Sequence, residues 1–329
     1  MDKRKLGTDG PMVSEIGLGC WSFAGSYGPT DKAESFDTLR TCQDLGIDFL
    51  DTAKAYGNGL SEEIIGEFMD THDNDFVVAS KGGIYRDPDS GARGFRNDEE
   101  YLRDCLEGSL KRLRMEQIPL YYVHKRDDRP IEDVMCTMLK FQQEGKIAHI
   151  AFCEISPASL RTISEMGKVA AVQSEYSLWT RYHDLGMIET CKELDVAFVP
   201  FSPLGRGIFA TQAPDPATFG EGDFRTGTPR FAQPNLARNL AYVERFKALA
   251  QDMGTTSPTL AVAWCLARGE HLLPIPGTRS TAHLQELAAA STLKLTDENM
   301  MQIEAILPVG WAAGDRYSRS QWAGVEGYC

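Results

Sequence analysis

Four polar side chains with complementary chemistry stand close to the ends of short apolar segments. Asp51, Lys81 and His124 close three consecutive segments of this kind, which are expected to be strands. Tyr56 follows Asp51 by five residues. A phenol has an ordinary pKa of about 10, and an adjacent ammonium group lowers it by favouring the ionised form. The set predicts a proton transfer centred on Tyr56, which would be the general acid in a reduction and the general base in an oxidation.

The other three residues would support that transfer. Asp51 would hold Lys81 charged and oriented, and a neutral His124 would hydrogen-bond the substrate oxygen. Taken singly, such residues are more often salt bridges or packed polar groups. Their joint occurrence at successive strand ends favours a catalytic set.

The elements that would position these residues follow a regular alternation. Short β-branched or aromatic segments alternate with longer segments of helical period, such as 98–114 and 131–144, from about residue 16 to about residue 290. This alternation predicts βαβ units and a parallel sheet. Eight strands are expected, at Ile16 to Cys20, Asp48 to Asp51, Phe76 to Ser80, Leu120 to His124, Ile147 to Phe152, Ala171 to Gln173, Ala197 to Phe201 and Leu272 to Ile275.

Eight such repeats favour a closed barrel over an open sheet. An open doubly wound sheet typically has about six strands and a glycine fingerprint after the first, which the turn GLGCWSFAG lacks. We therefore expect an α/β fold, a single-domain (β/α)8 TIM barrel over residues 1–329, with a core at about 16–290 and a C-terminal helix and tail at 291–329. The ends of neighbouring strands meet at one face of such a barrel, where its active site lies.

Two irregular segments are expected around that face. The Gly/Pro-rich stretch 205–234 after the seventh strand is too long for a simple connection, so we interpret it as a mobile lid or a disordered segment. The C-terminal tail contains Trp311 and Trp322 and is expected over the barrel mouth.

Composition limits the class of protein. The chain has 329 residues, 42% of them hydrophobic and 25% charged, which is typical of a soluble globular protein. The net charge of −13 argues against a nucleic-acid partner. Since no apolar run approaches the ~20 residues of a membrane span and the N-terminus lacks a signal-peptide pattern, a cytoplasmic protein without membrane partners is expected. The cysteines and histidines have no metal-ligand spacing, so we expect no metal.

Seven segments distributed along the chain resemble signature segments of the aldo-keto reductases, in family order over about residues 1 to 305. They read GLGCW, DTAKAYGNGLSE, SKGG, YYVHKRD, QSEYSLW, FSPLGRG and IPGTRS. The resemblance implies a catalytic tetrad of Asp51, Tyr56, Lys81 and His124, the same set that the strand ends indicate. It implies an oxidoreductase that transfers a hydride between NADP(H) and the carbonyl or alcohol carbon of an aldehyde, ketone or sugar-like substrate.

The same resemblance implies where the cofactor would lie. Gln173 and residues 153 and 154 would hydrogen-bond the nicotinamide carboxamide, and Phe201 would stack on its ring. Residues 201–206 would border the pyrophosphate, and 277–287 would hold the adenosine ribose, any 2′-phosphate and the adenine. The full expected set is Trp21, Asp51, Cys153, Glu154, Gln173, Phe201, Ser202, Leu204, Gly205, Arg206, Gly277, Thr278, Arg279, His283, Glu286 and Leu287. Loops carrying Trp21, Tyr85 and Trp179 would shape the substrate pocket.

Several positions depart from the family's usual residues. Cys153 stands where Ser is common, and Phe201 where Tyr or Trp is common. His283 stands where a cation or Gln is common, and Leu287 where Asn usually meets adenine. Arg279 can still pair with a 2′-phosphate, so NADP(H) is expected to be preferred while NAD(H) stays possible.

Two other functions remain open. The family also includes cofactor-binding subunits that modulate a potassium channel, so a regulatory subunit of a channel or other assembly is an alternative. A lyase or isomerase would use Lys81 as a Schiff-base amine. The expected partner is a small carbonyl or alcohol substrate, and neither its identity nor the oligomeric state follows from the sequence.

Overall fold

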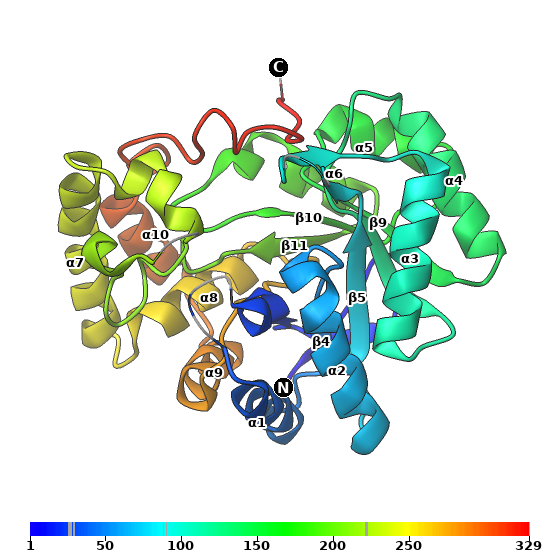
Figure 1. Ribbon diagram of the computed structural model, residues 1–329. Coiled ribbons are helices and arrows are strands. Elements are labelled where there is room, and N and C mark those ends of the chain that lie inside the picture. The colour runs from blue at the N-terminus through cyan, green and yellow to red at the C-terminus, as the bar shows by residue number, and fades with distance from the viewer. Residues whose placement is uncertain (26–27, 29, 88, 90, 221–222, 329) are drawn as a thin grey trace.

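The centre of the molecule is a parallel sheet of seven strands that curves into a barrel surrounded by helices (Figure 1). The computed structural model describes residues 1–25, 28, 30–87, 89, 91–220 and 223–328. In spatial order the strands are β11 (Ala197–Phe201), β10 (Ala171–Glu175), β9 (Ile147–Cys153), β8 (Ile118–Val123), β5 (Val77–Gly82), β4 (Phe49–Asp51) and β3 (Leu18–Gly19). The predicted parallel barrel is confirmed, and its first seven strands lie where the sequence indicated.

The eighth expected strand, Leu272 to Ile275, pairs with its neighbours without forming a regular strand. Isolated parallel bridges join Leu272 and Ile275 to β11, and Gly277 to Gly19 of β3. The carbonyls of Pro274 and Pro276 accept hydrogen bonds from the amides of Gly17 and Gly19, at 3.0 and 3.1 Å. Proline has no N–H and cannot donate a backbone hydrogen bond to a neighbouring strand. This segment therefore closes the barrel with an incomplete set of inter-strand hydrogen bonds.

Ten α-helices are present in the described part of the chain, and most lie between consecutive strands. They are α1 (Lys32–Leu45), α2 (Leu60–Thr71), α3 (Glu99–Leu113), α4 (Ile131–Gln143), α5 (Pro157–Ser164), α6 (Met187–Glu193), α7 (Asn235–Asp252), α8 (Ser257–Ala267), α9 (Thr281–Ala288) and α10 (Asp297–Ile306). The expected helix 98–114 is α3 with its two caps: Asp98 accepts from the Tyr101 amide at 3.0 Å, and Arg114 ends the helix in a left-handed conformation. None of the helices in these ranges is long and apolar enough to cross a membrane.

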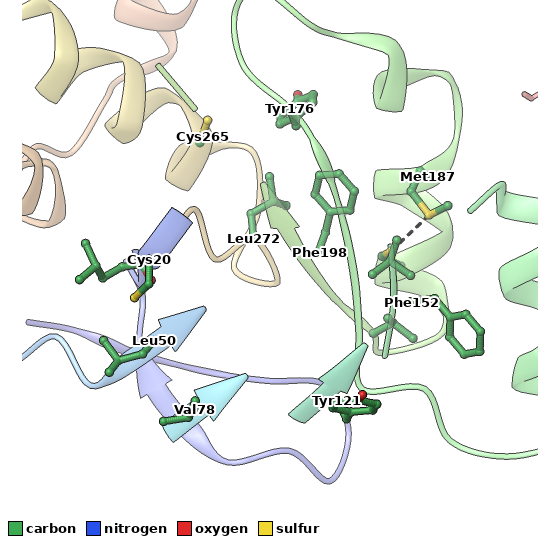
Figure 2. Packing of buried hydrophobic residues seen from close by; sticks show 14 of the residues in the cluster. Cys20, Leu50, Val78, Tyr121, Phe152, Tyr176, Met187, Phe198, Cys265 and Leu272 are labelled. Carbon is green, nitrogen blue, oxygen red and sulfur yellow. Dashed lines mark hydrogen bonds between the residues drawn. The ribbon is translucent and has the colours of Figure 1, made fainter. Parts of the chain in front are cut away.

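Side chains alternate between the barrel interior and the layer beneath the helices, as the two-residue period of a strand requires. Leu50, Val78 and Tyr121 point outward into the large cluster shared with the helices (Figure 2). Phe49, Ala79, Tyr122 and other inward-facing residues form a separate interior cluster. A hairpin of β1 (Lys3–Lys5) and β2 (Met12–Ser14), which the sequence analysis missed, adds buried Leu6 and Val13 to this interior.

A second hairpin lies at the strand ends. It consists of β6 (Ile84–Arg86) and β7 (Arg93–Phe95), and it follows β5 directly. Its Phe95 lies so close to Gly324 of the C-terminal tail that a Cβ there would stand 2.8 Å from the ring. The hairpin and the tail therefore meet over the same end of the barrel.

The long segment after β11 is folded in its described residues. It contains the short 3-10 turns Pro216–Thr218, Phe224–Gly227 and Pro229–Phe231, and Phe231 is buried against Trp179 with ring centroids 5.3 Å apart. Phe224 packs edge-on against Trp21 at 5.8 Å. The expected alternative of a disordered segment is therefore wrong for this described part of the chain.

Candidate active site

The inward register of the strands places three of the four tetrad residues at the barrel mouth, and Tyr56 begins the 3-10 turn Tyr56–Gly59 that follows β4. Phe49, Ala79 and Tyr122 belong to the interior cluster. The residues two positions further along are Asp51, Lys81 and His124, and a two-residue step keeps the same face of the strand. The same step leads from Ala171 to Gln173 in β10 and from Val199 to Phe201 in β11. Five strands therefore direct the predicted residues to one end of the barrel.

Lys81 forms hydrogen bonds to two other members of the tetrad, Asp51 and Tyr56. It is fully buried and forms an ion pair with Asp51, whose side chain is 2% exposed. Its Nζ also donates to the Thr52 carbonyl at 2.9 Å and to the Tyr56 hydroxyl at 3.2 Å. The Gln173 amide donates to the second oxygen of Asp51 at 2.6 Å. All three N–H groups of the ammonium are thus used, and one of them is aimed at the phenol.

The electrostatics of Tyr56 differ from the simple expectation of a lowered pKa. Burial raises the pKa of Tyr56, and the neighbouring Lys81 lowers it by a smaller amount, so the net shift is upward. The phenol therefore holds its proton at neutral pH. That state suits a general acid, and Lys81 favours the phenolate that forms when the proton leaves.

The surroundings of His124 favour its neutral form. Burial lowers the pKa of His124 well below its ordinary value, and Lys81 and Arg93 act in the same direction. Its ring lies 5.8 Å from the Tyr56 ring, and within the described ranges its buried Nδ1 has no hydrogen-bond partner. On the other side of Tyr56, Trp21 lies 6.2 Å away. A carbonyl oxygen beside Tyr56 would meet the imidazole and the phenol together.

The turn after β11 has a backbone suited to an anion. Ser202, Gly205 and Arg206 have φ values of 52°, 54° and 58°, and left-handed residues within a turn direct successive amides toward one side, where they form an anion-binding concavity. This observation fits the pyrophosphate that the sequence analysis expected at 201–206. Leu204 lies in the same turn, partly buried against the core.

Two of the expected cofactor residues belong to a buried ionic cluster. Glu154 forms an ion pair with Arg316 and accepts from the Glu175 amide at 2.9 Å. Arg206 pairs with Glu175 and donates to the Tyr317 hydroxyl at 3.1 Å. Burial raises the pKa of Glu154, but the combined effect of Arg316 and Lys125 is larger, and the net shift is downward. The carboxylate of Glu154 is therefore already bonded to Arg316 of the tail. A nicotinamide carboxamide could bind this carboxylate only in addition to Arg316.

The segment expected at the adenosine end divides into accessible and buried parts. Arg279 donates to the Gly28 carbonyl at 3.2 Å and lies 3.6 Å from the Glu34 carboxylate. His283 is exposed at the start of α9, and Glu286 accepts from Thr211 at 3.2 Å. The neighbouring Gly277 and Thr278 lie against β3 and beside the N-cap of α9.

Leu287 is the part that does not fit the expected role. It is 2% exposed and packs in an apolar cluster with Ile16 and Val262. The expected placement of Leu287 at the adenine is therefore wrong. An apolar residue on the inner face of α9 lowers the free energy of the fold more by packing on α8 than by remaining exposed.

Of the three expected pocket residues, only Trp21 lies beside the tetrad. Tyr85 packs on Tyr101 of α3, with ring centroids 5.8 Å apart. Trp179 is 3% exposed and covered by Phe231. The last two expectations are therefore not supported, because both rings are used for packing within the protein.

The tail contributes residues that the sequence analysis did not single out. Arg316 and Tyr317 are both nearly buried, and the guanidinium of Arg316 lies 6.0 Å from the Phe201 ring. In Figure 1 the tail runs from α10 toward α5 and α6. The expected cover over the barrel mouth is thus present. Trp311 of the tail donates to the Leu178 carbonyl at 2.7 Å. Within the described residues no group of three or more His, Cys, Asp or Glu could hold a metal ion.

Comparisons with known proteins agree with this architecture. A sequence model described as the aldo/keto reductase family matches residues 15–308. Probable aldo-keto reductase 1 of Glycine max is 35% identical over 95% of this chain and 91% of its own length. Aldo-keto reductase yakc of Schizosaccharomyces pombe, whose name specifies NADP(+), is 35% identical over 95% and 94%. The solved glycerol dehydrogenase AKR11B4 from Gluconobacter oxydans superposes with a TM-score of 0.84 at 28% identity, over 93% of this chain and 95% of that one.

Proposed function

The chain belongs to the aldo/keto reductase family, and from that membership we propose that it transfers a hydride between NADP(H) and the carbonyl or alcohol carbon of an aldehyde, ketone or sugar-like substrate. The observation that carries the proposal is the hydrogen bond from buried Lys81 to the Tyr56 hydroxyl. Preference for NADP(H) is supported by the yeast relative's name and by Arg279 beside the start of α9.

The residues of the mouth have separable roles. NADPH, when bound, supplies the hydride that the carbonyl carbon accepts. Tyr56 donates its proton to the carbonyl oxygen, and Lys81 favours the resulting phenolate. Neutral His124 hydrogen-bonds the same oxygen and positions it. The left-handed turn at 202–206 would hold the pyrophosphate. For alcohol oxidation the proton transfer runs in reverse, with Tyr56 as the base.

The direct test is turnover. Purified protein is offered a panel of aldehydes, ketones and sugars, and NADPH oxidation is followed by the absorbance of the reduced nicotinamide. We expect saturable reduction of at least one class of carbonyl. No turnover with any of them, together with no alcohol oxidation by NADP(+), would rule out the proposed function.

The Schiff-base alternative is disfavoured by the state of Lys81. Burial alone would lower the pKa of Lys81, but Asp51 and Tyr56 raise it above its ordinary value. A Schiff-base lysine needs the opposite shift, because only the neutral amine attacks a carbonyl. Borohydride in the presence of a carbonyl substrate is therefore expected to leave the mass of the protein unchanged.

Cofactor choice yields a prediction at Arg279. Arg279→Ala is expected to weaken NADPH binding by roughly ten- to a hundredfold and to change NADH binding little, since a charge-assisted contact is available only to the 2′-phosphate. Fluorescence titration of the protein with each reduced cofactor measures both dissociation constants. Equal losses for the two cofactors would show that Arg279 does not contact the phosphate.

A control for this prediction is the carboxylate of Glu34, 3.6 Å from Arg279. Because Glu34 competes with a phosphate for the same guanidinium, Glu34→Gln is expected to tighten NADPH binding and to leave NADH binding unchanged. Weaker NADPH binding in this variant would contradict the assigned competition.

A further inference from the structure

Lys125 is a buried cation without a carboxylate to pair with. It follows His124 in the chain, is 8% exposed, and lies under the tail with its Nζ 5.9 Å from the Tyr317 ring centroid. In the part of the chain that the structure describes, its Nζ has no hydrogen-bond partner and forms no ion pair. An unpartnered buried ammonium is costly, so its retention calls for an explanation such as a bound anion.

The nearby acidic group cannot fill that role. Glu154 contributes a favourable charge interaction with Lys125, but its carboxylate is bonded by Arg316 and by the Glu175 amide. Burial lowers the pKa of Lys125 to about 8, so the group still carries its charge at neutral pH. The structure thus places a positive charge beside the catalytic histidine and provides no bonded counter-charge for it.

A second cation reaches the same region from the β6–β7 hairpin. Arg93 stands directly opposite Arg86 in the hairpin register, an arrangement of like charges that destabilises a strand pair. Across the described ranges neither arginine forms an ion pair with a carboxylate. The charge of Arg93 also lowers the pKa values of His124 and Lys125. The Arg93 guanidinium lies 5.5 Å from the Phe95 ring centroid, and Phe95 packs against Gly324 of the tail. The guanidinium therefore lies at the end of the barrel that the tail covers.

We propose that Arg93 and Lys125 form an oxyanion subsite beside His124, and that the carbonyl substrate carries a carboxylate or phosphate at its non-reacting end. The inference rests on the proposed function, which supplies the reacting end at Tyr56 and His124. An oxyanion would satisfy the buried ammonium and relieve the repulsion between the hairpin arginines. Guanidinium and ammonium groups are the usual protein ligands of both anions.

The test compares substrates that differ in one charge. 4-Carboxybenzaldehyde is paired with methyl 4-formylbenzoate, and glyceraldehyde 3-phosphate with glyceraldehyde. We expect kcat/KM to favour the anion in at least one pair, through a lower KM. The favoured pair identifies the anion as a carboxylate or a phosphate. No preference for the anion in either pair would overturn the subsite while leaving the proposed function standing.

Substitutions of Arg93 and Lys125 test whether these two residues cause the preference for the anionic substrate. Arg93→Gln and Lys125→Met are each expected to reduce the ratio of kcat/KM for the anionic over the neutral substrate by roughly ten- to a hundredfold. Arg161→Gln and Lys140→Met remove one positive charge each from surface ion pairs with Glu193 and Glu99, and they are expected to leave the ratio unchanged. Equal ratios in all four variants would overturn the proposal.

Two readouts do not depend on turnover. Calorimetric binding of 4-methylbenzoate should weaken in Arg93→Gln and Lys125→Met and persist in the two controls, which separates failure of the anion site from failure of the reaction. The melting temperature of Lys125→Met should equal or exceed that of the unmodified protein, since an unpaired buried charge is removed. A large fall in melting temperature with an unchanged substrate ratio would assign Lys125 to the fold alone.

The pH dependence supplies a further check. KM for the anionic substrate should rise as the pH passes about 8, where Lys125 loses its charge, and this rise should be absent in Lys125→Met. The titratable or charged groups that act on Lys125 are Glu154, Arg316, Cys153 and Arg93. Burial raises the pKa of the Cys153 thiol well above this range. A KM that stays constant between pH 7 and 9 would contradict binding of the anion by Lys125.

Discussion

Tyr56→Phe is expected to lower kcat/KM for carbonyl reduction by about 10²- to 10⁴-fold, because it removes the proton that the substrate oxygen receives. The ring between Trp21 and His124 is retained, so the packing of the mouth should persist. Lys81 keeps its bonds to Asp51 and to the Thr52 carbonyl. The dissociation constant of NADPH and the melting temperature should therefore change little while turnover is lost.

A matched control is available on the outer face of β8. Tyr121 is fully buried beneath the helices, and its hydroxyl has no hydrogen-bond partner in the described ranges. Tyr121→Phe removes the same atom without touching the mouth, and it should leave kcat/KM and the melting temperature nearly unchanged. If Tyr56→Phe retained activity within a few fold of the unmodified protein, Tyr56 would not be the proton donor.

Lys81→Met is expected to abolish measurable reduction and to destabilise the fold. Among the residues that the structure describes, the substitution leaves the buried Asp51 carboxylate with only the Gln173 amide as a bonded side chain. Leaving one member of a buried ion pair without its counter-charge typically costs about 3 to 5 kcal/mol of unfolding free energy. Thermal and denaturant unfolding would measure the loss, and single-turnover kinetics at saturating NADPH would measure the chemistry.

The double variant Asp51→Asn, Lys81→Met separates the two effects. It removes both charges, so stability should recover in part, while activity should not, because Tyr56 still lacks the cation that favours its ionised form. Any residual alcohol oxidation should require higher pH than in the unmodified protein, since Lys81 lowers the pKa of Tyr56. Recovery of activity together with stability would make Lys81 a structural residue.

The tetrad could be predicted because its geometry follows from local rules. A two-residue period and a closed parallel barrel are enough to bring Asp51, Lys81 and His124 together once their strands are recognised. The direction of the Tyr56 pKa could not be predicted in the same way. The sequence indicates a neighbouring ammonium, whereas the burial that outweighs it depends on which side chains, such as Trp21 and His124, pack around the Tyr56 ring in the folded protein.

Leu287 and Glu154 show the same limit for cofactor contacts. Their positions in the chain indicate a cofactor role by resemblance, but the rotation of α9 turns Leu287 into the core, and Arg316 of the tail bonds the Glu154 carboxylate. The residues that contact Leu287 and Glu154 are distant from them in the sequence. No local sequence pattern therefore predicts these contacts.

The sequence alone determined the parallel barrel and the order of its strands, and it indicated the proposed proton-transfer set, because periodicity and strand-end position are properties of neighbouring residues. Tertiary structure decided which of those groups are buried, which are already paired and which charges lack a partner. Arg316 reaches Glu154 across 162 residues, and Lys125 is left unpaired as a consequence. Such pairings depend on long-range packing, and their electrostatic effect grows as water is excluded.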